Sequence, residues 1–292
     1  MKRIVIARSA GFCFGVKRAM SIADETAAAG KAAGTIASLG PLIHNPQAVE
    51  ELEKRGVRVA ATVDDIASGT VIIRSHGIMR TDHEALVAKG VRIVDATCPF
   101  VAKAQEHARA LSQQGYAVIV VGDTNHPEVK SIISYIEPGV PTITSLREIR
   151  EATKIRKAGI VAQTTQSFDH LMQFVGEAIR KFPDVRVCNT ICNATTLRQR
   201  ESTALAGAVE VMIVMGGYNS ANTRRLAELC REINPKTIHI ETADELPVDR
   251  VDPVATVGVT AGASTPQWII DALVSRIRDV WQGRKIGVSY YK

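Results

Sequence analysis

Aromatic residues are scarce in this chain of 292 residues, where phenylalanine, tryptophan and tyrosine together make up 4%. Proteins that bind single-stranded nucleic acid stack bases on aromatic side chains, so this scarcity argues against such a function. The sequence also has no block of like charges, because 36 Lys and Arg are interspersed with 30 Asp and Glu to give a net charge of +6. We therefore expect a mildly basic surface that attracts small anions or an acidic protein, and no nucleic-acid ligand.

Long hydrophobic runs are missing as well. The longest, such as Ala117–Val121 and Val211–Met215, have the length of strands and are too short to cross a membrane. Arg8 interrupts the first apolar run too early for a signal peptide. We predict a cytoplasmic protein with no membrane association, whose five cysteines stay reduced unless they bind metal or take part in redox chemistry.

One pattern is present many times: a short β-branched run ends in Gly, Ser, Thr or His, and an amphipathic helix follows. This alternation predicts an α/β fold with mostly parallel sheets. The expected strands include Lys2–Ala7, Thr35–Leu39, Val71–Arg74, Arg92–Asp95, Ala117–Val121, Ile160–Ala162, Val185–Cys188, Val211–Met215 and Ala255–Thr260. The expected helices include Gln47–Arg55, Val101–Gln114, Phe168–Lys181, Thr223–Glu232 and Gln267–Trp281.

Three cysteines occupy the same place in this pattern, between a strand and the helix that follows. They are Cys13, Cys98 and Cys192, and each interval between them is close to a third of the chain. We interpret the chain as three similar α/β units, one over 14–97, one over 98–191, and one that combines 1–13 with 192–282. Residues 283–292 are expected to form a C-terminal tail.

A thiolate at a helix N-terminus is stabilised by the helix dipole, so these three cysteines are candidate metal ligands. Their wide spacing matches neither a zinc finger nor the local cysteine run of a ferredoxin. Soft thiolates favour an iron–sulfur cluster or zinc, and three ligands leave a fourth position open for catalysis. The alternative is that each is a small buried hydrophobic residue. Cys188 in a strand and Cys230 in a helix are expected to pack without a ligand role.

Polar residues at the other strand ends indicate an anionic ligand, since α/β folds bind ligands where their parallel strands end. His44, His76 and His126 are candidate anion or metal ligands or proton carriers. Glu128 is either a proton donor or an acidic residue in the first turn of a helix. Hydroxyl and amide side chains suit a small phosphate ester or diphosphate, while no Walker A or G-x-G-x-x-G sequence indicates a nucleotide. These candidates are Thr164, Thr165, Ser220, Asn222 and Ser264.

Together these segments resemble the 4-hydroxy-3-methylbut-2-enyl diphosphate reductase (IspH/LytB) family. The segments that carry the resemblance run in family order from residue 11 to 266: GFCFGVKRA, HNPQAVEEL, RSHGI, DATCPFV, NHPEV, QTTQS, ICNATTLRQ, NSANTRRL and TAGASTP. Two positions depart from the family pattern, Ala221 in place of a serine and Asn125 in place of Gly or Ala.

The resemblance implies three α/β units around a central cavity that holds one [4Fe-4S] cluster. By motif its ligands are Cys13, Cys98 and Cys192, with the fourth iron position open. The implied reaction is the last step of the methylerythritol phosphate (non-mevalonate) route, which reduces the hydroxylated diphosphate to isopentenyl and dimethylallyl diphosphate. The implied partner is a single-electron donor such as ferredoxin or flavodoxin.

The same resemblance implies a role for each site residue. Glu128 matches the proton donor, Thr164 the threonine beside the substrate hydroxyl, and Thr165 follows it. The set that binds the diphosphate is His44, His76, His126, Ser220, Asn222 and Ser264, and His126 also passes protons toward Glu128. We expect a monomer or weak dimer.

Two other hypotheses fit part of the pattern. A quinolinate synthase also uses three cysteines from three similar domains, but it lacks the histidine set and the QTTQS motif. An iron–sulfur sensor that binds nucleic acid would need a clustered basic face, which the interspersed charges do not indicate.

Overall fold

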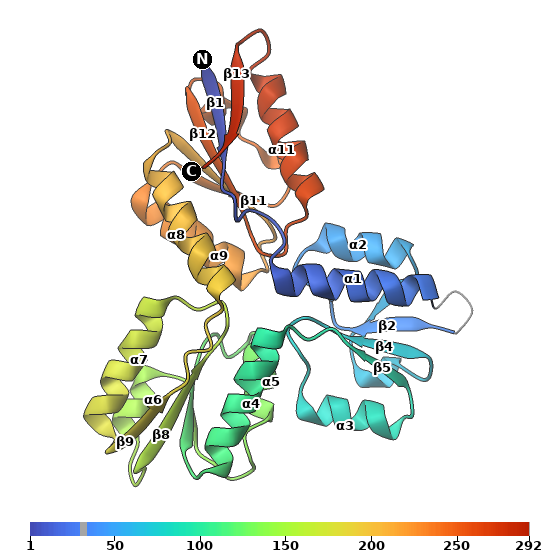
Figure 1. The fold of residues 1–292 in the computed structure, drawn as a ribbon, viewed down its shortest axis with the longest axis vertical. Helices are drawn as coiled ribbons and strands as arrows, with labels where there is room; N and C mark the ends of the chain where they lie inside the picture. The colour runs from blue at the N-terminus through green and yellow to red at the C-terminus, as the bar shows by residue number, and fades with distance from the viewer. Residues whose placement is uncertain (30–33, 292) are drawn as a thin grey trace. The chain divides into compact units, whose positions relative to one another are not determined.

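The computed structural model describes residues 1–29 and 34–291 and contains three separate sheets (Figure 1). Sheet A has the strand order β11-β10-β12-β1-β13, sheet B has β3-β2-β4-β5, and sheet C has β7-β6-β8-β9. Each strand pair among the described residues is parallel. The predicted α/β class with parallel sheets is therefore confirmed.

Strands and helices alternate along the chain. The strands are β1 Lys2–Ile6, β2 Ile36–Leu39, β3 Val57–Ala60, β4 Thr70–Ile73, β5 Arg92–Asp95, β6 Ala117–Val121, β7 Thr142–Ile143, β8 Lys157–Ala162, β9 Asp184–Val187, β10 Val211–Met215, β11 Thr237–Ile240, β12 Thr256–Ala261 and β13 Ile286–Tyr290. The α-helices are α1 Phe14–Ala29, α2 Pro46–Lys54, α3 Arg80–Ala88, α4 Pro99–Gln113, α5 Pro127–Ser134, α6 Leu146–Glu151, α7 Phe168–Lys181, α8 Asn193–Gly207, α9 Ala221–Ile233, α10 Val248–Val251 and α11 Gln267–Val280. No helix in these two described ranges is long and apolar enough to cross a membrane.

By its internal contacts the chain divides into two compact units. The first consists of residues 1–16, 44–49 and 193–292 and contains sheet A. The second consists of residues 17–43 and 50–192 and contains sheets B and C. The three predicted boundaries fall in connections between sheets, and the division into 14–97, 98–191 and 1–13 with 192–282 stays a prediction.

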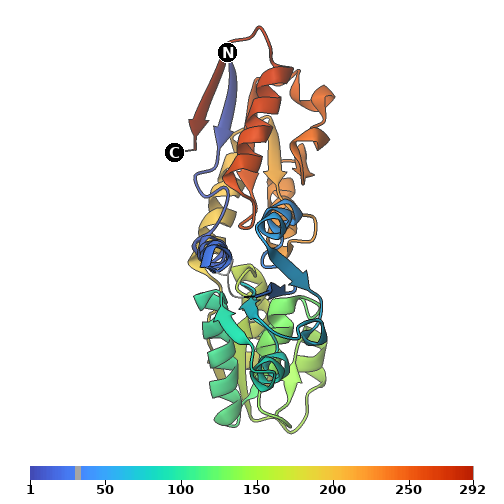
Figure 2. The ribbon, with the colours of Figure 1, turned by 90° about the vertical axis from the view of Figure 1, so that its right-hand side faces the viewer.

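Sheet A brings the two ends of the chain together. Strand β1 pairs with β12 on one side and with β13 on the other, and Figure 2 shows β1 and β13 side by side. Helices α8 and α9 cover one face of this sheet, while α11 covers the other (Figure 1). The expected tail therefore supplies an edge strand, and its last residue, Lys292, lies outside the described residues.

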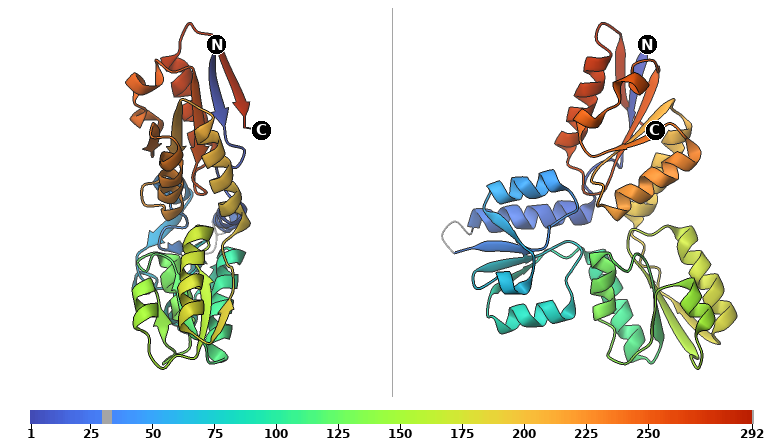
Figure 3. Two further views of the ribbon diagram at one scale, coloured as in Figure 1. Left: turned by 90° about the vertical axis from the view of Figure 1, so that its left-hand side faces the viewer. Right: turned by 180° about the vertical axis from the view of Figure 1, so that it is seen from behind.

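Sheets B and C have helices on both faces. Helices α4 and α5 lie over one face of sheet C, and α6 and α7 lie over the other (Figure 3, right). Proline opens three helices, at Pro46, Pro99 and Pro127, because the first helical position needs no free amide. Ser167 caps α7 by accepting a hydrogen bond from the amide of His170.

Most expected elements occur within one or two residues of their predicted bounds. One position differs in a way that matters for the cysteines: β9 ends at Val187, so Cys188 lies just after the strand rather than in it. Its amide still donates to the carbonyl oxygen of Ile160 at 2.9 Å, which extends the ladder with β8 by one hydrogen bond. Cys188 is half-buried and Cys230 is buried in α9.

The core of the first compact unit is anchored by Trp281, which is fully buried at the end of α11. Its indole nitrogen donates to the carbonyl oxygen of Val251 at 3.0 Å. The ammonium of Lys2 lies 5.2 Å from the ring centroid and donates to the carbonyl oxygens of Asp252 and Val254. One residue thus links α11, α10 and β1.

Replacing Trp281 with Ala should lower the free energy of unfolding by about 3–5 kcal/mol, because truncating a buried Trp leaves a cavity. The matched control is Trp268→Ala on the same helix, where the side chain is 51% exposed. The control should change stability by less than about 0.5 kcal/mol. Urea denaturation followed by circular dichroism measures both, and equal losses for the two variants would contradict this assignment of the core.

Candidate functional site

Each of the three predicted ligand cysteines lies immediately before a helix. Cys13 precedes α1, Cys98 is the N-cap residue of α4, and Cys192 precedes α8. All three are of intermediate exposure. A set of accessible thiols at helix N-termini has the donor chemistry that an iron–sulfur cluster needs, so these residues fit such a group.

The backbone holds these cysteines in the same way. The amide of Cys13 donates to the carbonyl oxygen of Ala263 at 3.1 Å. The amide of Cys98 donates to Ser75 at 2.9 Å, and that of Cys192 donates to Thr164 at 3.0 Å. Ala263, Ser75 and Thr164 each follow a strand that neighbours the strand before the cysteine. The backbone of each cysteine is therefore fixed to the loop that follows a neighbouring strand.

Glu128 and Thr164 form a buried pair in the second compact unit. The Glu128 carboxylate accepts the Thr164 amide at 2.6 Å through Oε1 and the Thr164 hydroxyl at 3.0 Å through Oε2. Glu128 is 2% exposed and Thr164 is 5% exposed. Burial raises the pKa of the Glu128 carboxyl to about 7, while the two hydrogen bonds from Thr164 oppose that rise. The carboxyl can therefore both hold and release a proton near neutral pH.

His126 is the N-cap residue of α5 and is buried. Its Nδ1 accepts the amide of Glu128 at 3.1 Å, so the proton of the neutral ring is assigned to Nε2. The His126 and His76 rings lie edge to face, with 5.5 Å between their centroids. An Nε2–H group beside a second imidazole can donate hydrogen bonds to an anion.

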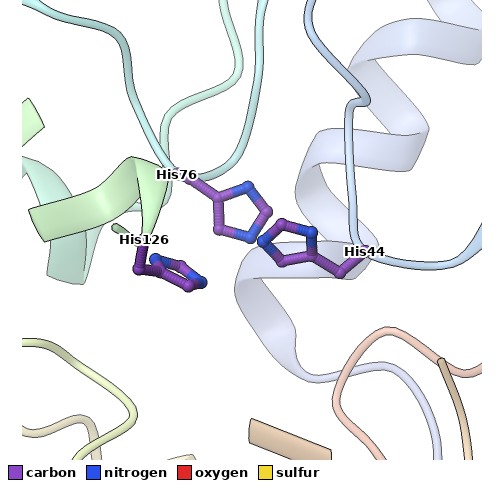
Figure 4. A group of neighbouring side chains, drawn as sticks. All are labelled: His44, His76 and His126. Atoms are coloured by element: carbon purple, nitrogen blue, oxygen red, sulfur yellow. The ribbon is translucent and has the colours of Figure 1, made fainter. Parts of the chain in front are cut away.

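The third histidine, His44, follows β2 and belongs to the first compact unit, whereas His76 and His126 belong to the second (Figure 4). The loop before His44 is fixed by Leu42, whose carbonyl oxygen accepts both the amide and the hydroxyl of Ser75. Such a group could hold a metal or an anion. A histidine that binds metal usually donates its other ring N–H, whereas Nδ1 of His126 accepts a hydrogen bond. The arrangement therefore favours an anion.

The hydroxyl and amide candidates of the first compact unit lie at the ends of its strands. Ser220 caps α9 by accepting the Thr223 amide, and Asn222 lies in the first turn of that helix. Ser264 follows β12 and is buried with them. Gly262 allows this close packing, because a Cβ there would lie 2.0 Å from the Thr223 hydroxyl. Thr165, in the second compact unit, follows Thr164 and is half-buried.

One supporting residue in the second compact unit has no role in the sequence-based interpretation. Gln163 is 1% exposed, and its side-chain oxygen accepts the amide of Asp123 at 3.1 Å. This hydrogen bond fixes the loop that leads to His126. Its only sequence signal is its place in QTTQS directly before Thr164.

The fold and these residues define an α/β protein with a thiol set suited to a metal cluster and a buried acid beside strand-end histidines. The model of the family described as LytB protein matches residues 4–278. The chain belongs to the LytB family, as its motifs predicted.

Relatives agree with this assignment over nearly the whole chain. A 4-hydroxy-3-methylbut-2-enyl diphosphate reductase of Geobacter metallireducens is 53% identical over 277 residues, which cover 95% of this chain and 97% of the relative. The reductase of the same description from Trichlorobacter lovleyi is 53% identical over 278 residues, or 95% of this chain and 98% of the relative.

Two solved structures are similar as well. One is described as (E)-4-hydroxy-3-methyl-but-2-enyl diphosphate reductase, the terminal enzyme of the non-mevalonate pathway. It is 47% identical with a TM-score of 0.72, covering 96% of this chain and 100% of that one. The reductase from Plasmodium falciparum, at 24% identity, has a TM-score of 0.90 and covers 99% of this chain and 92% of that one. At this identity the second likeness supports the fold alone.

Replacing Glu128 with Gln should change how stability depends on pH. Because the folded-state pKa is raised, the folded chain binds more protons than the unfolded chain between about pH 4.5 and 7. Wild-type stability should therefore fall as pH rises through this window and level off above it. Glu128→Gln should lack this fall in urea denaturation at pH 5, 6, 7 and 8.

The control for this experiment is Glu177→Gln. A hydrogen bond from Arg150 lowers the pKa of the Glu177 carboxyl, so its stabilising contribution is present at neutral pH and lost in acid. Removing Glu177 should therefore lower stability at pH 7. The same pH profile for Glu128→Gln and wild type would contradict the raised pKa.

Proposed function

We propose that this chain catalyses the reductive dehydroxylation of (E)-4-hydroxy-3-methylbut-2-enyl diphosphate. Two electrons and two protons break the allylic C–O bond, and the products are water and either isopentenyl or dimethylallyl diphosphate. The chain is thus an oxidoreductase of the non-mevalonate route, in agreement with the described activity of its relatives. The predicted cytoplasmic location fits this role and stays a prediction.

One hydrogen-bonded series carries this proposal. The Glu128 carboxyl bonds both the amide and the hydroxyl of Thr164, and the carbonyl oxygen of Thr164 accepts the amide of Cys192. A group with a pKa of about 7 and a candidate cluster ligand are thus joined through one residue. A reaction that delivers electrons and a proton to the same C–O bond requires this proximity of acid and metal ligand.

Cys13, Cys98 and Cys192 are the proposed ligands of one [4Fe-4S] cluster with an open fourth iron position, in a central cavity. When bound, the cluster would supply electrons and a Lewis-acidic iron for the substrate hydroxyl. Thr164 would orient that hydroxyl through its own hydroxyl group. Glu128 would give a proton to the leaving oxygen, because expelling hydroxide without protonation is costly.

The substrate's diphosphate is proposed to bind the histidines and the hydroxyl set. His126 donates from Nε2 because its Nδ1 already accepts the Glu128 amide, and the His76 ring lies beside it. His44 of the first compact unit is proposed to bind the diphosphate with them. The residues of the first compact unit proposed for the same role are Ser220, Asn222 and Ser264. Thr165 is proposed to contribute next to Thr164. Since Ala221 retains a backbone N–H in the first turn of α9, its lack of a hydroxyl weakens this binding at most.

The test of the function is anaerobic cluster reconstitution followed by turnover of the diphosphate with reduced methyl viologen. Cys13→Ser, Cys98→Ser and Cys192→Ser should lose the brown cluster absorbance or the activity. The matched controls Cys188→Ser and Cys230→Ser should keep both. Wild-type chain with an intact cluster and no turnover would contradict the proposed reaction, and cluster loss on Cys188→Ser with retention on Cys192→Ser would contradict the ligand set.

Glu128→Gln should lower turnover by about two to four orders of magnitude, the usual cost of losing a general acid. Substrate affinity should change little, because Gln keeps the shape and the diphosphate contacts remain. Pre-steady-state turnover and calorimetric binding measure the two separately, with Glu137→Gln, at a half-buried residue that follows α5, as control. Affinity lost in proportion to rate would make Glu128 a binding residue.

The proposed electron donor is a small acidic iron–sulfur or flavin protein of the ferredoxin or flavodoxin kind. A chain with a net charge of +6 attracts such a donor electrostatically, and salt screens this attraction. Turnover with a protein donor should therefore fall as ionic strength rises, while turnover with the small viologen cation should not. The same salt dependence with both donors would exclude electrostatic docking.

A further inference from the structure

The LRQ part of the ICNATTLRQ motif contains an arginine that the proposed chemistry does not use. Arg198 lies in α8 and is 3% exposed. Its Nη2 donates to the carbonyl oxygen of Gly11 at 2.8 Å, and its Nη1 donates to that of Ala261 at 2.7 Å. Burying a guanidinium is costly unless its donors are satisfied, so a buried arginine bonded to two carbonyls has a specific positional role.

Each of the two carbonyls belongs to a loop of the first compact unit that carries a proposed ligand. Gly11 is two residues before Cys13, a proposed cluster ligand. Ala261 ends β12, three residues before Ser264, a proposed diphosphate ligand. The amide of Cys13 also donates to Ala263, within the same turn as Ser264. Arg198 therefore bridges the loop of the cluster ligand and the turn of the diphosphate ligand.

Glu201, one turn further along α8, holds only the first of these loops. Its Oε1 accepts the amide of Arg8 at 2.7 Å, and its Oε2 accepts the amide of Ser9 at 2.8 Å. Glu201 thus accepts two backbone amides of the 8–13 loop, those of Arg8 and Ser9, while Arg198 donates to one of its carbonyls. Gly11 has a φ of +96°, which favours glycine and lets the chain turn between these two attachments.

We propose that Arg198 and Glu201 are positioning residues, which fix the Cys13 loop to α8, and that Arg198 also couples this loop to the Ser264 turn. The proposal rests on the proposed function, because it assigns Cys13 to the cluster and Ser264 to the diphosphate. Hydrogen bonds to an ionised group are stronger than neutral ones, so their loss lets the loop open more often. Residues that support metal ligands in this way change metal affinity without touching the metal.

The test compares four variants of the reconstituted full chain: Arg198→Met, Arg198→Lys, Glu201→Gln and Arg200→Gln. Arg200 is the control, since it is exposed on the same helix between the two proposed residues. One measurement is the rate of cluster loss to an iron chelator under anaerobic conditions, with the electron paramagnetic resonance spectrum of the reduced cluster. The other is the calorimetric affinity for inorganic pyrophosphate.

Arg198→Met should lose its cluster about tenfold faster and bind pyrophosphate about fivefold more weakly, because both loops are released. Arg198→Lys should be intermediate, since one ammonium cannot repeat the two-pronged contact. Glu201→Gln should speed cluster loss but leave pyrophosphate affinity unchanged. Arg200→Gln should match wild type in both measurements.

If these residues were purely structural, each variant would have a lower melting temperature and an unchanged electron paramagnetic resonance spectrum, and Glu201→Gln would change the rate of cluster loss and the pyrophosphate affinity together. That result would overturn the proposal. Wild-type rates and affinities in Arg198→Met would overturn it as well. If Arg198→Met fails to fold, Glu201→Gln and Arg198→Lys still decide the outcome. A wild-type chain that assembles no cluster would instead overturn the proposed function, while the pyrophosphate affinities would still test the Ser264 coupling.

Discussion

Much of this site depends on the hydrogen bonds between adjacent strand ends in parallel sheets. In each of three sheets, a cysteine after one strand donates its amide to a carbonyl after the neighbouring strand. The accepting residue lies at or next to a proposed substrate ligand: Ala263 precedes Ser264, Ser75 precedes His76, and Thr164 is itself one. The register of a sheet therefore fixes the backbone of each cysteine relative to the backbone at or beside a proposed substrate ligand.

Burial then sets the pKa of the proposed proton donor, Glu128. An exposed glutamate is ionised at neutral pH and cannot act as an acid, but Glu128 is almost fully buried and its pKa rises to about 7. The hydrogen bonds from Thr164 limit this rise and fix the carboxyl in place. The same two hydrogen bonds therefore fix the position of the carboxyl and keep its pKa close to neutral pH.

The sequence predicted the repeated strand–helix pattern well because buried parallel strands and amphipathic helices leave strong periodic signals. It also placed the three cysteines correctly before their helices. Strand β13 was not predicted, because Ile286–Tyr290 is a half-exposed edge whose strand character comes from pairing with β1, far away in the sequence. Arg198 and Glu201 were not predicted either, since hydrogen bonds to the backbone carbonyls and amides of a distant loop leave no periodic pattern.

The strand order of sheet A has a consequence for folding during synthesis. Strand β1 leaves the ribosome before the strands of sheets B and C, whereas its partners β12 and β13 leave after them. Domains generally fold as units during synthesis, so sheets B and C can form while β1 still lacks both neighbours. The Cys13 loop follows β1 and is held by α8 and the turn after β12, so it also stays free until late. Assembly of the proposed cluster on Cys13 would therefore have to wait for the synthesis of β12, and until then the nascent chain exposes this thiol to oxidation.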